Sequence, residues 1–259
     1  MPEIKAAFFD IDGTLLPFGA GQLPQSTVQA LAALRQRGVG VYLATGRPPV
    51  HLPYLKALNG HHFDGYVTMN GQYCYDESGE VYANPMPLRT LRLLLDYLET
   101  TDLSVAFIEK DHAYFNRVNA LSADFSKKLG QFEEDTARAL REPVYQLNAF
   151  LPPEQEADFV RHCPGCAVVR WSPDFCDILP AGGGKPEGIA HMLAHRGLQR
   201  SQSIAFGDGG NDITMLRYAG IGVAMGNAAD TVKQAADYVT ADVTDDGIAK
   251  ALRHFGLIG

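Results

Sequence analysis

The first 70 residues of the chain alternate between short, mainly apolar runs and one amphipathic stretch. The runs show no polar alternation, as expected of strands buried on both faces of a parallel sheet, and they cover residues 4–9, 39–44 and 66–69. Between the first two runs, a helical period gives one apolar face, made of Val28, Leu31, Ala32 and Leu34. Strand, helix and strand in this order predict a doubly wound, mostly parallel α/β sheet.

The ends of this first helix are predicted from its flanking residues. Ser26, followed three positions later by Gln29, is typical of an N-cap with a capping box. Gly38 follows the apolar face and suits the left-handed conformation that often ends a helix. We therefore expect a helix that begins after Ser26 and ends before Gly38.

The last third of the chain repeats this alternation of strands and helices. Pro186 suits the first turn of a helix, which we expect to extend to about Arg196. The pattern then predicts strands at 203–206, 221–225 and 238–240, and helices at 211–218, 230–236 and 246–255. The last third is therefore expected to complete the sheet that the first third begins.

The middle third has a different pattern, in which hairpins alternate with helices. Strands are expected at 72–75, 80–83, 104–108, 113–116, 144–150, 167–171 and 175–179, and helices at 88–98, 120–129 and 154–162. This pattern predicts an α+β cap domain inserted into the α/β core. Pro and Gly in Asn84–Pro87 and Pro180–Gly184 suit the two crossings, so residues 1–84 and 183–259 are assigned to the core and 85–182 to the insertion.

Composition and charge restrict the expected partners. The 259-residue chain is 46% hydrophobic and carries a net charge of -8, so nucleic acid and anionic membrane surfaces, which attract basic patches, are not expected. No apolar run approaches the ~20 residues that span a bilayer. Residues 1–10 lack the basic start and long apolar stretch of a signal peptide. We expect a cytoplasmic protein, and the sequence leaves its oligomeric state open.

The 4 cysteines are too few for a disulfide scaffold in a chain of this length. Cys163 and Cys166 have the CxxC spacing of a redox pair or of half a zinc site. The sequence has no second CxxC and no nearby pair of histidines at ligand spacing. Two reduced thiols in a turn between a helix and a strand are the favoured interpretation, and the other two stay open.

Asp10 and Asp12 directly follow the first predicted strand. Ligands of open α/β sheets bind beyond the carboxyl ends of the strands, so these acids are expected to face a binding crevice. Two carboxylates this close repel unless a cation lies between them or one is protonated. Both conditions suit phosphoryl transfer: a metal screens attack of the Asp10 carboxylate on phosphate, and a protonated Asp12 protonates the departing alkoxide. A solvated acidic turn is the alternative.

Thr45, Gly46 and Arg47 end the second predicted strand. A hydroxyl and free backbone N–H groups at this sheet edge suit the oxygens of a phosphate group. Thr45 equally suits the N-cap of a following helix, and the two roles are compatible.

Two further segments carry candidate ligands. Asp208 ends a late strand and is placed to bind a hard cation such as Mg²⁺ through oxygen. Asn211 and Asp212 open the next helix, where they can contact phosphate, a metal-bound water or Lys185. Lys185 begins a helix, where its charge opposes the helix dipole unless an anion is bound. An Asx-rich turn and a solvated lysine are the alternatives.

Together these segments resemble the four motifs of haloacid dehalogenase-like phosphatases. The matching stretches, in order, are Asp10-x-Asp12-Gly13-Thr14, Thr45-Gly46-Arg47, Lys185 and Gly207-Asp208-Gly209-x-Asn211-Asp212. The insertion between the second and third motifs resembles the large C2 cap of the Cof-type sugar-phosphatase branch, and the resemblance covers essentially the whole chain. Pro186 departs from the family pattern, because relatives usually have a small residue after this lysine.

The resemblance implies a role for each matching residue. Asp10 would be the nucleophile that forms an aspartyl-phosphate, and Asp12 would be the general acid/base and, through its backbone carbonyl, a metal ligand. The implied Mg²⁺ ligands are Asp10, Asp12 and Asp208; the implied phosphate-binding residues are Thr45, Gly46, Lys185 and Asn211; the implied supporting residues are Asp212, Arg47 and Asn70.

The implied function is Mg²⁺-dependent hydrolysis of small phosphorylated metabolites, sugar phosphates above all. The inserted domain is expected to close over the site and to select the substrate. A phosphotransferase or mutase with the same intermediate, and a phosphate-ligand sensor without turnover, are the alternatives. Asp12 argues against dehalogenation, because a halide leaves without a proton. The sequence identifies neither the substrate nor the residues of the inserted domain that select it.

Overall fold

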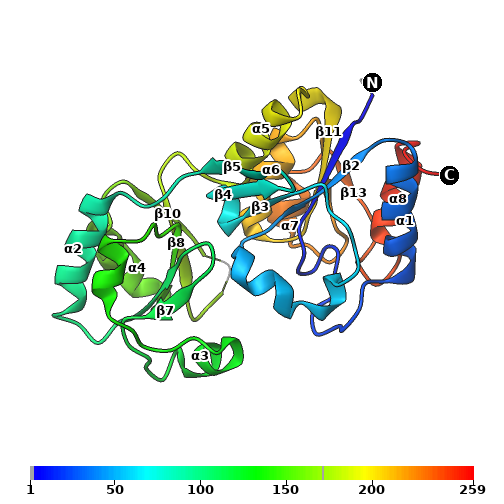
Figure 1. The fold of residues 1–259 in the computed structure, drawn as a ribbon. Coiled ribbons are helices and arrows are strands. Elements are labelled where there is room, and N and C mark those ends of the chain that lie inside the picture. Colours follow the sequence, from blue (N-terminus) through cyan, green and yellow to red (C-terminus); the bar gives the residue numbers. More distant parts are fainter. Residues whose placement is uncertain (1–2, 171) are drawn as a thin grey trace. The chain divides into compact units, whose positions relative to one another are not determined.

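The computed structural model of the chain describes residues 3–170 and 172–259 (Figure 1). These residues form two compact units, which are considered separately. The first comprises Met1–Arg47, Leu52–Tyr82 and Gly184–Gly259, and the second comprises Pro48–His51 and Ala83–Gly183. Pro48–His51 groups with the second unit, whereas the sequence analysis assigned these residues to the core.

The first unit is built on an eight-stranded sheet with the order β13-β12-β11-β1-β2-β3-β4-β5. All neighbours from β13 to β3 are parallel, and β4 runs antiparallel to β3. The strands are β1 (Ala6–Phe9), β2 (Gly40–Ala44), β3 (Gly65–Thr68), β4 (Tyr73–Asp76), β5 (Gly79–Ala83), β11 (Ser203–Gly207), β12 (Ile221–Ala224) and β13 (Tyr238–Val239). The predicted doubly wound, mostly parallel α/β sheet is confirmed.

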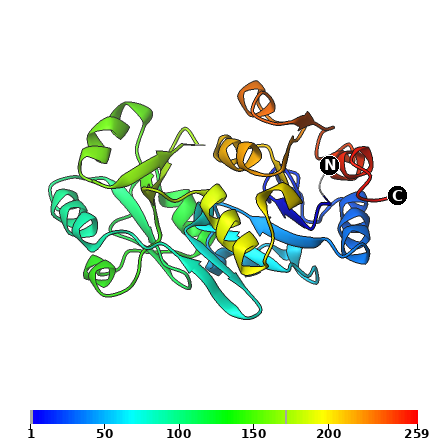
Figure 2. The same cartoon turned by 90° about the horizontal axis from the view of Figure 1, so that it is seen from above.

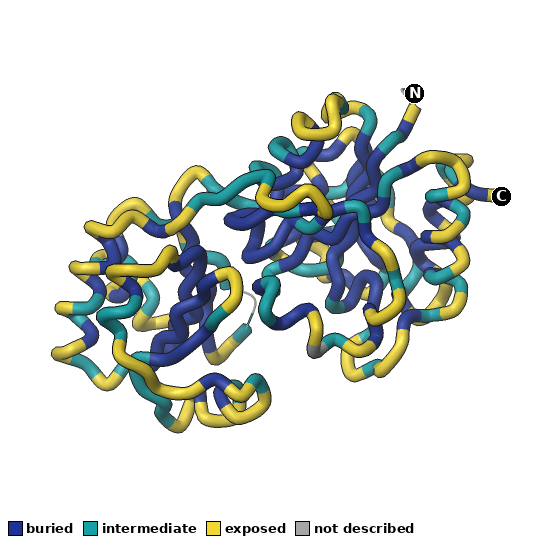
Figure 3. The backbone as a smooth tube through the Cα atoms, viewed as in Figure 1, coloured by how far each residue is buried: buried dark blue, intermediate teal, exposed yellow. Residues whose placement is uncertain are grey.

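Helices cover both faces of this sheet (Figures 1 and 2). Ala7 and Phe9 of β1 pack in one apolar cluster with α1 (Gln25–Gln36) and α8 (Gly247–His254). Ala6 and Phe8 pack on the other face, in a cluster with the helices α5 (Lys185–His195), α6 (Ile213–Tyr218) and α7 (Asp230–Lys233). Because both faces are buried, the strand lacks polar positions, and Figure 3 shows buried backbone along the strands.

The second unit has a five-stranded antiparallel sheet with the order β7-β6-β8-β10-β9. Its strands are β6 (Ser104–Ile108), β7 (Ala113–Phe115), β8 (Gln146–Phe150), β9 (Cys166–Val169) and β10 (Cys176–Pro180). The helices α2 (Leu88–Leu98) and α4 (Pro153–Arg161) share one apolar cluster with this sheet. Phe125 of α3 (Ala123–Leu129) packs edge-to-face against Phe150 and Phe175. The expected α+β architecture of the middle third is confirmed.

Short 3₁₀ helices link these elements. They are η1 (Pro49–Tyr54), η2 (Lys56–Leu58), η3 (Met69–Gly71), η4 (Thr136–Leu140), η5 (Arg200–Gln202) and η6 (Gly210–Asp212). The helix expected at 211–218 is therefore a 3₁₀ turn followed by α6, and Trp171, expected to end a strand, lies outside the described residues. Among the described residues, every helix is too short or too polar to span a bilayer.

The predicted N-cap of the first helix is wrong. Helix α1 begins at Gln25 with Pro24 as its N-cap, and Ser26 Oγ is buried without a hydrogen-bond partner among the described residues. Pro24 lacks an N–H and has its φ fixed by its ring, so the chain enters the helix before Ser26. The predicted end is confirmed, since Gly38 adopts φ 74° just past the helix.

The cysteines of the CxxC segment are free thiols, Cys163 buried and Cys166 half-buried. Burial raises the pKa of Cys163 to about 12 and that of Cys166 to about 11, so both are thiols at neutral pH. Neither joins a group of potential metal ligands among the described residues, which favours the interpretation as reduced thiols.

Candidate active site

The order of the strands gathers the candidate residues at one edge of the large sheet. Strands β11, β1, β2 and β3 are neighbours and parallel, so their carboxyl ends lie side by side. The residues just past these ends are Asp208, Asp10, Thr45 and Asn70. Strand β1 is also the point from which the chain turns to opposite sides of the sheet, where ligands bind in doubly wound folds.

Lys185 joins two of the predicted acids. Its Nζ donates to Asp10 Oδ1 at 2.6 Å and to Asp212 Oδ1 at 2.5 Å. The lysine side chain is 0% exposed and that of Asp212 is 1% exposed, so these charges are removed from solvent screening. Lys185 is the first residue of α5, which places its ammonium at the strand ends rather than in solvent.

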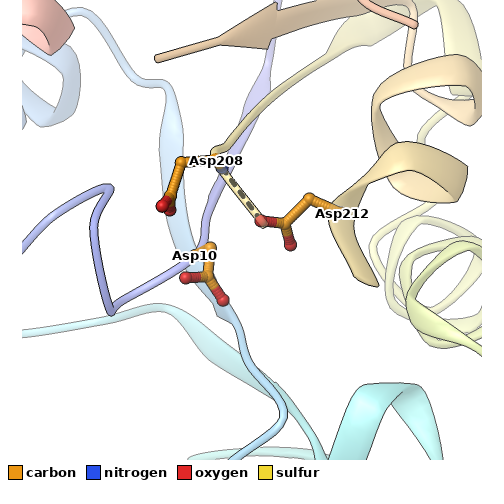
Figure 4. A group of neighbouring side chains, drawn as sticks. All are labelled: Asp10, Asp208 and Asp212. Atoms are coloured by element: carbon orange, nitrogen blue, oxygen red, sulfur yellow. Dashed lines mark hydrogen bonds between the residues drawn. The ribbon is translucent and has the colours of Figure 1, made fainter. Parts of the chain in front are cut away.

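Asp212 also fixes the loop that follows β11. Its Oδ2 accepts hydrogen bonds from Asp208 N at 3.0 Å and Gly209 N at 2.9 Å, the first of which is marked in Figure 4. Both oxygens of Asp212 thus have donors, and the side chain holds Lys185 and the Asp208 loop together. This arrangement suits the supporting role expected of Asp212 beside Asp208, the expected metal ligand.

Three carboxylates lie close enough to share one cation. Oxygens of Asp10, Asp208 and Asp212 lie within 4.8 Å of one another (Figure 4). Burial raises the pKa of Asp10 well above its ordinary value, and Lys185 opposes that rise; burial also raises the pKa of Asp208 to about 6. Three carboxylates carry more negative charge than the single ammonium of Lys185 balances. A divalent cation with a preference for oxygen, such as Mg²⁺, therefore fits this donor set.

The first motif packs directly against Asp208. Thr14 Oγ1 donates to Asp208 Oδ1 at 2.7 Å. Gly13 adopts φ 83°, and a Cβ at this position would lie 2.1 Å from Asp208 Oδ2. The glycine is therefore required both for its left-handed backbone and for its lack of a side chain.

Asp12 does not join the carboxylate cluster through its side chain. Arg47 donates to both of its oxygens, from Nε to Oδ2 at 2.6 Å and from Nη2 to Oδ1 at 2.8 Å. The metal contact expected of Asp12 is through its backbone carbonyl, and Arg47 occupies only the side-chain oxygens. The second motif thus contributes an arginine that orients the expected acid/base.

The turn after β2 uses most of its amides internally. Thr45 N donates to Val67 O at 2.8 Å, and Arg47 N donates to Thr45 Oγ1 at 3.1 Å. Among the described residues, Gly46 N has no acceptor, so it is the amide of this turn that stays available to a ligand. The N-cap expectation for Thr45 is wrong, because a turn and a 3₁₀ helix follow it in place of an α-helix.

Asn70 lies in an unusual turn at the end of β3. Met69, Asn70 and Gly71 all have positive φ, at 50°, 52° and 89°. Asn70 N donates to Thr45 O at 3.0 Å, and Asn70 Oδ1 accepts from Asn211 Nδ2 at 3.0 Å. Asn70 therefore links the second motif to the fourth, and such strained backbone is most often kept at functional sites.

The sequence analysis missed Asn227. Its Nδ2 donates to Gly13 O at 2.8 Å and lies 3.4 Å from Asp208 Oδ2. Asn227 lies just past the apolar strand β12, so the strand-end signal that identified Asp10 and Asp208 applied to it too.

Comparisons with known proteins agree with this geometry. A family model described as haloacid dehalogenase-like hydrolase matches residues 7–252. The putative phosphatase YkrA of Bacillus subtilis is 36% identical over 260 residues, which cover 99% of each chain. The pyridoxal phosphate phosphatase YbhA of Escherichia coli is 31% identical over 93% of this chain and 94% of its own length.

Solved structures resemble the whole chain as well. The sugar phosphatase BT4131, described as a member of subclass IIB, superposes with a TM-score of 0.89 at 37% identity and covers 98% of this chain and 100% of its own. BT1666 from Bacteroides thetaiotaomicron superposes with a TM-score of 0.91 at 32% identity, covering 99% and 96%.

Proposed function

The chain belongs to the haloacid dehalogenase-like hydrolase family and is a phosphatase, and we propose that it hydrolyses small phosphorylated metabolites with Mg²⁺ through an aspartyl-phosphate on Asp10. Its Cof-type resemblance agrees with the solved sugar phosphatase BT4131, which it matches over nearly all of its length. The observation that carries the proposal is the contact of one buried ammonium, that of Lys185, with Asp10 and Asp212.

In the proposed first step, a carboxylate oxygen of Asp10 attacks phosphorus and the bond from phosphorus to the ester oxygen breaks. Asp12, protonated, gives its proton to that leaving oxygen, so the alcohol departs neutral. Lys185 and Asn211, with Thr45 and Gly46, are the groups proposed to bind the phosphoryl oxygens.

In the proposed second step, water attacks the phosphorus of the aspartyl-phosphate. Asp12, now ionised, takes a proton from that water, the bond from Asp10 to phosphorus breaks, and inorganic phosphate leaves. Arg47, which contacts both oxygens of Asp12, is proposed to fix the plane of this carboxyl group in both steps.

Asp10 and Asp208, with the backbone carbonyl of Asp12, are the proposed Mg²⁺ ligands, and Asp212 supports them. Bound Mg²⁺ supplies positive charge that offsets repulsion between the attacking carboxylate and the phosphate. Its role is supported by the unbalanced charge of the cluster, where burial, together with the negative charges of Asp212 and Asp12, raises the pKa of Asp10 and of Asp208.

Sugar phosphates are the proposed substrate class. BT4131 is described as a sugar phosphatase, and YbhA is named for pyridoxal phosphate, a small phosphorylated molecule. The net charge of -8 gives no attraction to nucleic acid, in line with a small substrate.

The experiment is a screen of phosphorylated metabolites with the purified chain, in Mg²⁺ and in a chelator, measured as phosphate release. We expect release that needs Mg²⁺ and is lost in Asp10→Asn. The matched control is Asp96→Asn, on the exposed side of α2, which is expected to keep the parent rate. Substantial turnover by folded Asp10→Asn, with deamidation excluded by mass spectrometry, contradicts the assigned nucleophile.

The same reactions separate the alternative functions. A phosphotransferase or mutase would pass the phosphoryl group to an added sugar, which ³¹P NMR detects as a new phosphate ester in place of inorganic phosphate. A sensor would bind phosphate esters with Mg²⁺ present but release nothing.

A further inference from the structure

Asn227 lies just past β12, the strand next to β11 at the edge that holds the candidate site. It is exposed to solvent, yet both ends of its amide are hydrogen-bonded. Nδ2 donates to Gly13 O at 2.8 Å, and Oδ1 accepts from Val243 N at 3.0 Å. Two bonds at opposite ends fix the orientation of a side chain that would otherwise rotate freely in solvent.

The same Nδ2 lies 3.4 Å from Asp208 Oδ2. Thr14 Oγ1 donates to the other oxygen, Oδ1, at 2.7 Å. Asp208 is thus oriented by two donors, one on each oxygen, and each oxygen keeps a lone pair for a cation.

Asn227 also controls the position of the first-motif loop. There is no room for a side chain between Gly13 Cα and Asp208, since a Cβ there would lie 2.1 Å from Asp208 Oδ2. The hydrogen bond from Asn227 to Gly13 O therefore sets how closely this loop approaches Asp208.

We infer that Asn227 is a positioning residue for the cation site: its amide sets Asp208 and the Gly13 loop in the arrangement that binds Mg²⁺. This inference rests on the proposed function, which makes Asp208 a metal ligand. Val243 N holds the oxygen of this amide, so the loop after β13, which carries Val243, also contributes to the position of Asn227. The position requires a donor toward Gly13 O and Asp208 and an acceptor toward Val243 N, and an asparagine side chain supplies both.

The test is the dissociation constant of Mg²⁺, measured by isothermal titration calorimetry on the full chain without substrate. Asn227→Ala removes both hydrogen-bonding ends and is expected to weaken Mg²⁺ binding about tenfold, as loss of a hydrogen-bond partner of a metal ligand typically does. The matched control is Asn119→Ala in the second unit. Asn119 likewise donates to a backbone carbonyl, Asp102 O at 3.1 Å, and accepts from a backbone amide, Leu121 N at 3.1 Å.

Asn119→Ala is expected to keep the parent Mg²⁺ constant, although it loses the same kinds of bond. Thermal unfolding without Mg²⁺ gives the purely structural effect of each change. A folded Asn227→Ala with the parent Mg²⁺ constant overturns the inference. If Asn227→Ala does not fold, Asn227→Ser, whose hydroxyl is too short to bridge Gly13 O and Val243 N, takes its place with the same expected result.

Failure of the proposed function gives a different result from failure of this inference. A parent chain that binds no Mg²⁺ contradicts the proposed function and the inference together. If the parent chain binds Mg²⁺ and the Asn227 variants bind it equally tightly, the proposed function stands and only the role of Asn227 is contradicted.

Discussion

Arg47 contacts both carboxylate oxygens of Asp12, with Nε 2.6 Å from Oδ2 and Nη2 2.8 Å from Oδ1. Burial alone would lower the pKa of Arg47. The hydrogen bonds to Asp12 and the charge of Asp12 raise it by more, so the net shift of the pKa is upward. The planar guanidinium matches the carboxylate in a way that an ammonium does not. Arg47 and Asp12 therefore act as one oriented pair at the carboxyl ends of β1 and β2.

Arg47→Lys keeps the charge but loses the two parallel bonds, so we predict about a tenfold fall in kcat. The free energy of unfolding should change by less than about 1 kcal/mol, because both side chains are about one-third exposed and partly screened. Steady-state kinetics and urea unfolding measure the two effects. Parent-like kcat in this variant would mean that the orientation of Asp12 is set by other groups.

Lys185→Met replaces a buried ammonium by an apolar side chain of similar length. Asp10 and Asp212 then lose their shared counter-charge, so we predict a loss of about 3–5 kcal/mol of unfolding free energy at neutral pH. Phosphate release should fall by at least about 100-fold. The control is Lys250→Met, which removes an exposed lysine paired with Asp245 and should leave both quantities near the parent values. Equal stability of the two variants would refute the prediction.

Gly13→Ala and Gly19→Ala separate backbone strain from collision. Both glycines have positive φ, 83° and 78°, but a Cβ at Gly13 would lie 2.1 Å from Asp208 Oδ2, whereas one at Gly19 meets nothing within 4 Å. We predict that Gly19→Ala destabilises by about 1 kcal/mol through its backbone alone. Gly13→Ala should destabilise more and also weaken Mg²⁺ binding, as calorimetry would measure. Unchanged Mg²⁺ binding in Gly13→Ala is the contrary outcome.

Asn70→Ala and Asn70→Gly separate the role of the amide from that of the turn. Both lose the hydrogen bond to Asn211 Nδ2, so both should weaken the binding of inorganic phosphate by a similar factor, about tenfold. Glycine accepts φ 52° without strain, so Asn70→Gly should be about 1 kcal/mol more stable than Asn70→Ala. Phosphate affinity that differs between the two variants would show that backbone strain, and not the amide, controls the site.

Asp76 gives a pH-dependent prediction away from the site. Burial would raise its pKa, but hydrogen bonds from Ser78, together with Arg196 and His195, lower the pKa below its ordinary value. A carboxyl group whose pKa is lowered in the folded state stabilises the fold at pH values above its unfolded-state pKa. That stabilisation is lost as the pH falls through the folded-state pKa.

Asp76→Asn should therefore destabilise by about 1–2 kcal/mol at pH 7, and this difference should shrink below about pH 4. Urea unfolding of parent and variant across this range measures it. A difference that stays constant down to acid pH would show that the charge of Asp76 does not stabilise the fold.

Much of the core was predictable because its strands are apolar on both faces. Ala6–Phe9 alternates between two buried clusters, which removes polar positions and makes the run visible in the sequence. The acid that follows such a run, Asp10, was identified for the same reason. Helix starts were less predictable. Ser26 was predicted to be the N-cap, yet α1 begins at Gln25 with Pro24 as its N-cap, because the chain enters the helix from a proline whose φ is already fixed.

Pairings between distant side chains were not predictable in the same way. Nothing local to Asp12 indicates that Arg47 will occupy both its oxygens, and nothing local to Asn227 points to Gly13. Such contacts depend on which strands are neighbours and on the conformations of the turns that follow them. Three successive φ values are positive at Met69–Gly71, and Asn70 in this turn is hydrogen-bonded to Thr45 and Asn211, which are distant in sequence.

The sequence by itself determined which residues stand at the ends of strands, since buried strands need uninterrupted apolar side chains and their polar successors mark the edge. Tertiary structure alone decided that β11 lies beside β1, bringing Thr14 and Asp208 within 2.7 Å across 194 positions of chain. The reason is that strand order is set by how both faces of the sheet are covered, and no single segment carries that information.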